Sequence, residues 1–191
     1  ASFLILSSLI FNSPISIKGV LLNSTRTGFV RAAKKMGASI EITKKRYLYG
    51  EQIADIIVNR DSVIKSISID PIDIVDMIDE VPAISVLATM ANGWTEIRGV
   101  SELRLKESDR INAIVTNLSA FGGEVKEFKD GFKFRAKKLY NTRISSFSDH
   151  RIAMAFYILS RSICRKPELD NINCIKKSYP AFINDIEKIA K

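Results

Sequence analysis

The sequence has a single histidine, His150, and only two cysteines, Cys164 and Cys174, among its 191 residues. One histidine excludes a multi-histidine metal site. The cysteines are separated by nine residues, which is not the spacing of a zinc or redox motif. We therefore expect two free thiols, as in proteins of a reducing compartment, and no metal site.

Long hydrophobic runs are missing as well. No apolar stretch reaches the ~18 residues that a membrane-spanning helix requires. The opening run, residues 1–11, could pass for the end of a signal peptide, but it lacks a basic segment and a small-residue cleavage site. We expect it to form a buried helix. Because no initiator methionine precedes it, we also expect the chain to be part of a longer protein.

Acidic residues are outnumbered by basic ones, 21 to 29, which gives a net charge of +8. Such an excess suits nucleic acid, an anionic membrane or a small anionic substrate, although lysine-rich composition alone can also produce it. With 46% hydrophobic and 26% charged residues, the chain has an ordinary globular composition. Its length allows one large domain or two small ones. Only the placement of the arginines distinguishes these ligands.

The chain contains an internal repeat. Residues 3–42 and 81–127 share one order: apolar helix, strand ending in Ile-basic-Gly-Val, polar loop, helix, glycine and strand. Gly19 in the first copy corresponds to Gly99 in the second. A third, partial copy covers residues 149–190. Helices that alternate with strands in repeated units predict an α/β repeat architecture.

Local patterns support this assignment. Alternating β-branched residues predict strands at residues 14–20, 38–46, 52–60, 63–70, 94–100, 123–128 and 131–136. Helical spacing predicts helices at residues 29–36 and 110–121. The last two strands form a predicted hairpin with Asp130 and Gly131 in the turn. Gly37 and Gly122 stand where a helix end favours a residue that can adopt a positive φ. Residues 59–66 are the candidate linker.

The segment LRLKESDRI, which precedes the second predicted helix, carries the strongest chemical signal. Ser108 or Asp109 is a suitable helix cap, but capping does not explain Lys106 and Arg110. Cations are unfavourable at a helix start unless an anion binds there. Arg110 lies four residues after Lys106 and three after Glu107, so the side chains project together. A carboxylate between two cations is a candidate general acid or base.

Four more polar clusters lie in equivalent places, each in a loop that leads into a helix. They are DMIDEVP (76–82), FSDHRIAMA (147–155), STRTG (24–28) and KKSYP (176–180). In the first, Asp79 or Glu80 either caps the helix or points into a cleft. If the repeats stack with parallel helices, all clusters meet at one end. They then form a basic rim of Arg26, Lys106, Arg110, Arg151 and Lys177, with Asp79 and Glu107 among them. Such a rim predicts an anionic ligand with several phosphate or carboxylate groups.

LRLKESDRI followed by SDHRIAMA resembles the enolpyruvyl transferase family that acts on shikimate 3-phosphate, the 5-enolpyruvylshikimate-3-phosphate synthases. NSTRTG, IDEVPAISVLA, GGEVKE and KKSYP occur in the matching order. The resemblance implies an inside-out α/β barrel of repeated βαβαββ units, arranged as two domains. Residues 1–60 would then be the last unit of the N-terminal domain, truncated at its start, and residues 61–191 the C-terminal domain. Upstream motifs of the family have no counterpart here, so the resemblance implies a C-terminal portion.

The resemblance also implies a reaction. The 5-hydroxyl of shikimate 3-phosphate attacks phosphoenolpyruvate, and phosphate leaves from a tetrahedral intermediate, on the pathway to chorismate and the aromatic amino acids. By position, Asp79 matches the family's proton acceptor and Glu107 the carboxyl that moves the methylene proton. Lys106 matches a lysine that bridges both substrates. Asp79 and Lys106 thus belong to the implied shikimate 3-phosphate site.

The remaining matched positions have binding roles. Arg110, Arg151 and Lys177 match cations that hold phosphoenolpyruvate. Arg26 matches an arginine that faces the shikimate phosphate. His150 either orients its neighbours or makes a structural hydrogen bond. The resemblance implies no cofactor, no metal, no nucleic-acid partner and no membrane partner. It implies a cytoplasmic enzyme that is monomeric at full length.

Three alternatives stay open on the sequence. The transferase that acts on UDP-N-acetylglucosamine shares the fold and the phosphoenolpyruvate chemistry. A basic non-catalytic module, even one that binds nucleic acid, is a second, although its basic clusters lack the interleaved aromatic residues that stack on single strands. A truncated product that is inactive alone is the third.

Overall fold

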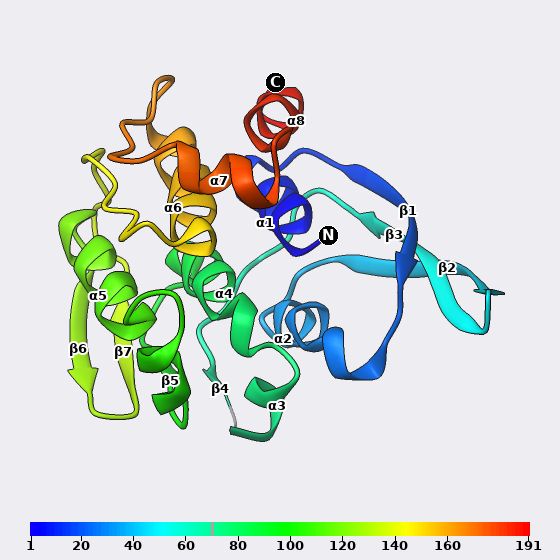
Figure 1. The fold of residues 1–191 in the computed structure, drawn as a ribbon, viewed down its shortest axis with the longest axis horizontal. Helices are drawn as coiled ribbons and strands as arrows, with labels where there is room; N and C mark the ends of the chain where they lie inside the picture. The colour runs from blue at the N-terminus through cyan, green and yellow to red at the C-terminus, as the bar shows by residue number, and fades with distance from the viewer. Residues whose placement is uncertain (70) are drawn as a thin grey trace.

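The computed structural model describes residues 1–69 and 71–191 (Figure 1). Its helices are α1 (Ser2–Phe11), α2 (Gly28–Lys35), α3 (Pro71–Val75), α4 (Val81–Leu87), α5 (Arg110–Ala120), α6 (His150–Ile163), α7 (Asn173–Ser178) and α8 (Phe182–Ile189). Its strands are β1 (Ile15–Leu21), β2 (Ile40–Leu48), β3 (Glu51–Val58), β4 (Ser68–Ile69), β5 (Thr95–Ile97), β6 (Glu124–Phe128) and β7 (Gly131–Arg135). Within the described ranges, no helix is long and apolar enough to cross a membrane.

Two copies of the predicted repeat share one topology. The first runs α1, β1, a 3₁₀ turn η1 (Ser24–Arg26), α2, β2, β3, and the second runs α4, β5, a 3₁₀ turn η4 (Ser101–Leu105), α5, β6, β7. In both sheets the last strand lies between the other two, antiparallel to each, in the orders β1-β3-β2 and β5-β7-β6. β4 adds to the second sheet, parallel to β5. The repeat is therefore confirmed, and the third copy contributes α6, α7 and α8.

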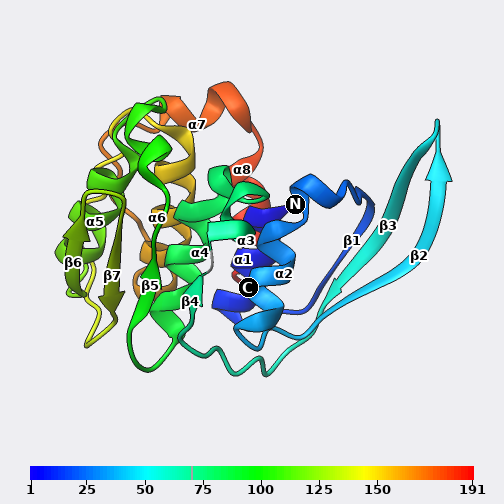
Figure 2. The same ribbon diagram turned by 90° about the horizontal axis from the view of Figure 1, so that it is seen from below.

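The first helices of the three copies, α1, α4 and α6, pack against one another in the centre. The two sheets lie on opposite sides of these helices (Figures 1 and 2). All seven residues of α4 are buried, as expected for a helix that is apolar on every face. Helices inside and sheets outside agree with the inside-out α/β architecture expected from the sequence. Buried residues from both sheets and all three copies join one core cluster.

Two local predictions need correction. The hairpin of β6 and β7 forms, but its turn is Lys129–Asp130, because Phe128 pairs with Gly131. Gly131 belongs to the strand, where a Cβ would approach the carbonyl oxygen of Ile97 to 2.1 Å. The strand predicted at residues 63–70 is reduced to β4, and residue 70 lies outside the described residues. The helix-ending glycines are confirmed at Gly37 and Gly122, with φ values of +99° and +94°.

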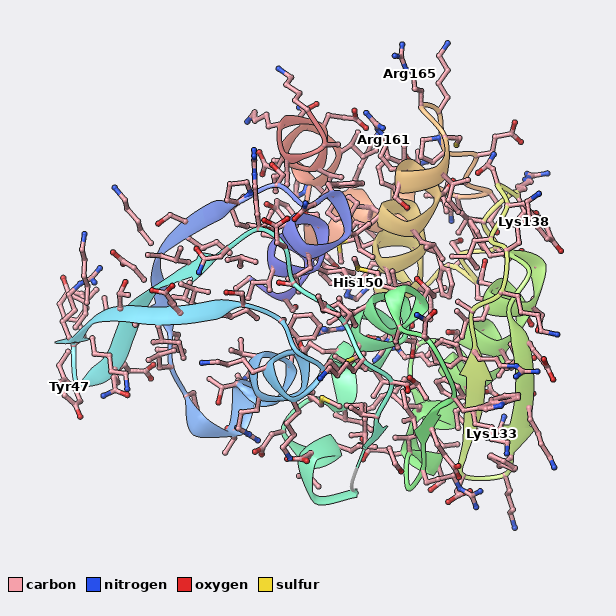
Figure 3. The ribbon with its side chains drawn as sticks, turned by 180° about the vertical axis from the view of Figure 1, so that it is seen from behind. Tyr47, Lys133, Lys138, His150, Arg161 and Arg165 are labelled. Carbon is pink, nitrogen blue, oxygen red and sulfur yellow. The ribbon has the colours of Figure 1, made fainter. Side chains whose placement is uncertain are left out.

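The β2–β3 hairpin extends away from the helices (Figure 2). Tyr47, near its end, points away from the body of the molecule (Figure 3) and is 74% exposed. Residues 59–67 connect this first sheet to the second. The division into domains at residues 60 and 61 remains a prediction.

Gly28 brings the η1 turn close to the segment that leads to Asp79. A Cβ on Gly28 would lie 2.8 Å from the carbonyl carbon and oxygen of Asp76 and from Cβ of Met77. Gly28→Ala must therefore displace backbone, and we expect it to lower the free energy of unfolding in urea by about 1–3 kcal/mol. Lys34→Ala, an exposed change on the same helix, is the control, with an expected effect within about 0.5 kcal/mol. Equal effects of the two variants would contradict the close approach.

Candidate active site

Four helices, α2, α4, α5 and α6, begin within the predicted clusters, and an aspartate caps each of the last two. The carboxylate of Asp109 accepts the backbone N–H of Asn112 at 3.0 Å at the start of α5. The carboxylate of Asp149 accepts the backbone N–H of Arg151 at 2.8 Å at the start of α6. Such caps satisfy N–H groups that the helix leaves free and complement its dipole. They fix Arg110 and Arg151 in the first turns of their helices.

Arg110 is the centre of the site. Its side chain is fully buried, and it donates through Nε to Asp149 at 2.7 Å, through Nη1 to Asp79 at 2.9 Å, and through Nη2 to Glu107. Asp149 is also fully buried, whereas the side chains of Asp79 and Glu107 are 42% and 52% exposed. Burial alone would lower the pKa of the guanidinium, but Asp149 raises it further above its already high ordinary value. Arg110 is thus a permanent cation beneath two accessible carboxylates.

Asp79 and Glu80 belong to the 3₁₀ turn η2 (Ile78–Glu80), directly before α4. Arg151 donates through Nη1 to the backbone oxygen of Asp79 at 3.2 Å and to Glu80 Oε1 at 3.3 Å. Its Nη2 lies 3.4 Å from Asp79 Oδ2. Asp79 is therefore shared by Arg110 and Arg151. This sharing brings the starts of α4, α5 and α6 together.

The pKa values of the neighbouring carboxylates Asp79 and Glu80 are shifted in opposite directions. Burial alone would raise the pKa of Asp79, but the charges of Arg151 and Arg110 and the hydrogen bond from Arg110 lower it below its ordinary value. Burial raises the pKa of Glu80, and Arg151 only partly offsets it. Asp79 is consequently ionised at neutral pH and can accept a proton. Adjacent groups whose environments separate their pKa values are typical of acid–base sites.

Lys106 stands beside this group in the loop before α5. Its Nζ lies 2.5 Å from Glu102 Oε1, one helical turn earlier in the chain. That hydrogen bond raises the pKa of Lys106 above its ordinary value, and the charge of Asp79 acts in the same direction. Lys106 is therefore fully charged at neutral pH.

A cavity of about 370 Å³ lies beside Glu107. Its lining includes Glu107, His150 and Lys177. Burial lowers the pKa of His150 below 6.5, so the imidazole is neutral at pH 7. This cavity links the carboxylate of Glu107 to the last predicted cation.

Lys177 reaches the site from a different element than predicted. It lies in the last turn of α7 instead of in a loop, but its cluster still leads into a helix, because α8 begins at Phe182. Just before α7, the side chain of Asn171 accepts the backbone N–H of Asn173 at 3.1 Å. A lysine in a last turn complements the helix dipole, which favours this placement.

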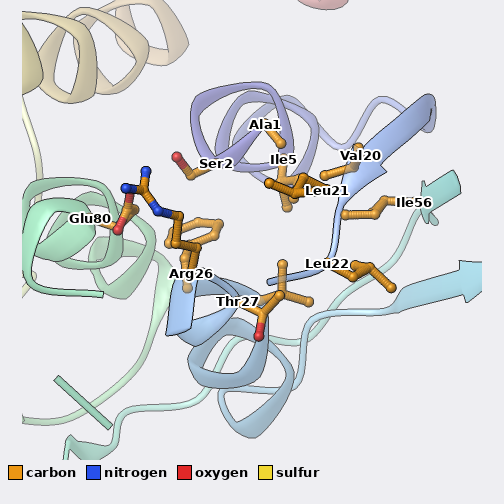
Figure 4. A pocket seen from close by; sticks show the side chains of 12 residues that line it. Ala1, Ser2, Ile5, Val20, Leu21, Leu22, Arg26, Thr27, Ile56 and Glu80 are labelled. Atoms are coloured by element: carbon orange, nitrogen blue, oxygen red, sulfur yellow. The ribbon is translucent and has the colours of Figure 1, made fainter. Parts of the chain in front are cut away.

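Arg26, the last of the predicted site cations, lies in the 3₁₀ turn η1. It lines a cavity of about 190 Å³ together with Asp79, Glu80 and Arg151. It also lines an adjoining cavity of about 320 Å³ between α1, β1 and α2 (Figure 4). There the guanidinium of Arg26 and the carboxylate of Glu80 point toward each other (Figure 4). The cavities join Arg26 to the group around Arg110.

The structure thus brings all eight predicted site residues into one continuous region, but this region is not the basic rim that the sequence predicts. The rim, as we define it, comprises five cations and the five carboxylates that contact them. The cations are Arg26, Lys106, Arg110, Arg151 and Lys177, and the carboxylates are Asp79, Glu80, Glu102, Glu107 and Asp149. With His150 neutral, the described side chains of the rim carry no net charge. Among the described residues, only Arg26 and Lys177 of these cations form no ion pair.

Three of these carboxylates were not recognised as site residues from the sequence. Glu102 precedes Lys106 by four residues, a spacing that signals an ion pair and could have identified it. Asp149 was recognised only as a cap, since nothing in the sequence links it to Arg110, 39 residues away. For Glu80, the sequence leaves open whether it or Asp79 points into the cleft. Its contact with Arg151 spans 71 residues and has no local signal.

Comparison with known proteins gives one family. The sequence profile described as EPSP synthase (3-phosphoshikimate 1-carboxyvinyltransferase) matches residues 1–186. The whole chain is 41% identical to the 3-phosphoshikimate 1-carboxyvinyltransferase of Aquifex aeolicus (strain VF5) and 41% identical to that of Sulfurihydrogenibium sp. (strain YO3AOP1). It covers 44% of each relative, so the chain spans less than half the length of these curated proteins.

Solved structures agree. The EPSP synthase from Acinetobacter baumannii superposes on 98% of this chain with a TM-score of 0.92 and 29% identity, and the match covers 44% of that chain. The enolpyruvyl transferase NikO from Streptomyces tendae gives a TM-score of 0.67 at 13% identity over 98% of this chain and 41% of its own. The second likeness supports the fold alone.

Proposed function

The chain belongs to the EPSP synthase family, and from that premise we propose that it carries part of the site that transfers an enolpyruvyl group from phosphoenolpyruvate to the 5-hydroxyl of shikimate 3-phosphate. The observation that carries this proposal is the buried guanidinium of Arg110 beneath Asp79 and Glu107. A proton acceptor, a second carboxylate and a fixed cation then lie within one hydrogen-bonded group. Charge development in a closed site is stabilised best by such preorganised charges.

The proposed chemistry uses both exposed carboxylates. The 5-hydroxyl oxygen bonds to C2 of phosphoenolpyruvate, its proton passes to the Asp79 carboxylate, and C3 receives a proton from Glu107, which starts this step as the neutral acid. The tetrahedral intermediate then returns the C3 proton to Glu107. The C2–phosphate bond breaks, and the departing phosphate takes the proton held by Asp79. The lowered pKa of Asp79 suits this role, since its carboxylate is available as acceptor at neutral pH.

The cations take the roles that the family resemblance implies for their positions. Lys106, beside Asp79, bridges the two substrates. Arg110, Arg151 and Lys177 hold the carboxylate and phosphate of phosphoenolpyruvate, and Arg26 binds the phosphate of shikimate 3-phosphate. Guanidinium groups suit bidentate capture of such anions. We assign the full-length enzyme to the cytoplasm as a monomer, with residues 1–60 and 61–191 in its two domains.

A chimera tests the proposed function. In it, this chain replaces the matched segment of the Aquifex aeolicus relative, so that the remainder of the enzyme is present. We expect phosphate release from shikimate 3-phosphate plus phosphoenolpyruvate, and none when UDP-N-acetylglucosamine replaces shikimate 3-phosphate. Asp79→Asn in the same chimera should reduce kcat at least ~10²-fold. A folded chimera without phosphate release, or one that uses the UDP-sugar, would count against the proposal.

A further inference from the structure

Glu80 lies between two cations that the proposed function assigns to two different anions. It accepts from Arg151 Nη1 at 3.3 Å, and it faces Arg26 across the adjoining cavities. Its side chain is 24% exposed. An anion that binds Arg151 must therefore compete with this carboxylate.

We propose that Glu80 is an internal competitor for anions: its carboxylate neutralises Arg151 and faces Arg26, and a phosphate group binds by taking its place. This proposal deepens the proposed function and rests on it for the identity of the two arginines as anion ligands. It names Glu80 as the residue that sets the affinity and pH dependence of phosphate binding at this end of the rim.

The charge balance of the rim supports this role. Five carboxylates match five cations, so displacement of one carboxylate increases the net attraction of the rim for a phosphate that adds two negative charges. Asp149 and Arg110 are both fully buried and lie 2.7 Å apart, so the carboxylate of Asp149 cannot move away from Arg110. Glu80 lies at the edge of two cavities and makes a single 3.3 Å contact with Arg151. Displacing Glu80 from Arg151 therefore costs less than displacing Asp149 from Arg110.

Protonation offers a second way to remove its charge. Burial raises the pKa of Glu80, and the charge of Asp79 raises it further, whereas Arg151 and the amino group of Ala1 lower it. An anion placed on Arg151 would add another negative charge nearby and favour the neutral acid further. Anion binding should therefore be accompanied by proton uptake at Glu80, and should strengthen as the pH falls.

Sulfate binding to the 191-residue chain tests this directly. Sulfate is a suitable probe because it keeps the same charge from about pH 5 to about pH 8 and so reports only the titration of the protein. We expect Glu80→Gln to bind sulfate about tenfold more tightly than the original chain at pH 7.5, measured by calorimetry. We also expect the affinity of the original chain to rise as the pH falls, with a smaller rise in Glu80→Gln. Protonation of His150 affects both proteins alike, and acetylation of the amino group of Ala1 in both removes the other titrating group that is coupled to Glu80, so the difference between their profiles isolates Glu80.

Two further variants make the result specific. Glu124→Gln removes the same charge from the second sheet, where Arg135 and Lys137 lie 2.8 Å from Glu124, and it should leave sulfate affinity unchanged. Arg151→Gln added to Glu80→Gln should abolish the gain. An unchanged affinity in Glu80→Gln, an equal gain in Glu124→Gln, or a gain that survives loss of Arg151 each overturns the proposal.

These outcomes are separate from the fate of the proposed function, because the experiment needs neither turnover nor the rest of the enzyme. A gain in sulfate affinity that depends on Arg151, alongside a chimera that releases no phosphate, counts against the transferase assignment only. An active chimera with unaltered sulfate binding in Glu80→Gln counts against the role of Glu80 only.

Discussion

Glu107→Gln in the chimera is expected to lower kcat by about 10²–10⁴-fold while the dissociation constant of phosphoenolpyruvate changes less than about threefold. The amide keeps the size of the side chain and its hydrogen bond to Arg110, but it cannot carry a proton to and from C3. The ion pair of Glu107 with Arg110 is half exposed on the Glu107 side. Its loss should therefore change the free energy of unfolding by less than about 1 kcal/mol.

The control is Glu127→Gln, an exposed carboxylate that lies 2.8 Å from Arg104. It removes the same charge without touching the rim, and kcat should stay within about twofold. Steady-state phosphate release and calorimetric binding of phosphoenolpyruvate give the two quantities to compare. A loss of binding as large as the loss of rate would show that Glu107 acts as a binding residue instead of a proton carrier.

Asp149→Ala is expected to produce the largest loss of stability, about 3–5 kcal/mol in the free energy of unfolding. The variant removes the helix cap of α6 and leaves the guanidinium of Arg110 without its only fully buried partner. A buried charge that has lost its partner is far more costly than a missing cap alone. Urea denaturation of the 191-residue chain measures the difference.

Asp109→Ala provides the matched control, because Asp109 caps α5 in the same way. Its pair with Arg104 is partly exposed, with side-chain exposures of 38% and 27%, so its loss should cost only about 1 kcal/mol. If the Asp149 variant does not fold, the double change Asp149→Leu with Arg110→Met should restore folding, since it removes both charges. Equal effects of Asp149→Ala and Asp109→Ala would mean that the buried pair adds nothing beyond the cap.

Capping explains why so much of this site could be predicted. The carboxylates of Asp109 and Asp149 bind backbone groups two or three residues away, so residue order alone reveals the helix starts. The repeat then places those starts together, because copies with the same topology present equivalent loops at the same end. Lys106 and Arg110 stand out in the sequence as cations at such a helix start whose side chains project together.

What the sequence could not reveal depends on contacts between distant segments. The turn of the β6–β7 hairpin moves by one residue because Gly131 packs against the backbone of Ile97, a strand away. The pairing of Arg151 with Glu80 and of Arg110 with Asp149 joins residues far apart in the chain. The order of cations along the sequence therefore predicts a basic rim, whereas the fold brings as many carboxylates as cations into the same region.

The matched charges of the rim also bear on how fast an anion arrives. Opposite charges a few ångströms apart cancel beyond the screening distance of about 8 Å at physiological salt, so the rim exerts little pull on a ligand in solution. The net charge of +8 consequently belongs to the rest of the surface, which can raise the local concentration of anions without directing them. The association rate should depend on ionic strength through that wider surface. The dissociation rate of the anion should instead depend on how readily the carboxylates of the rim re-form their ion pairs with the cations.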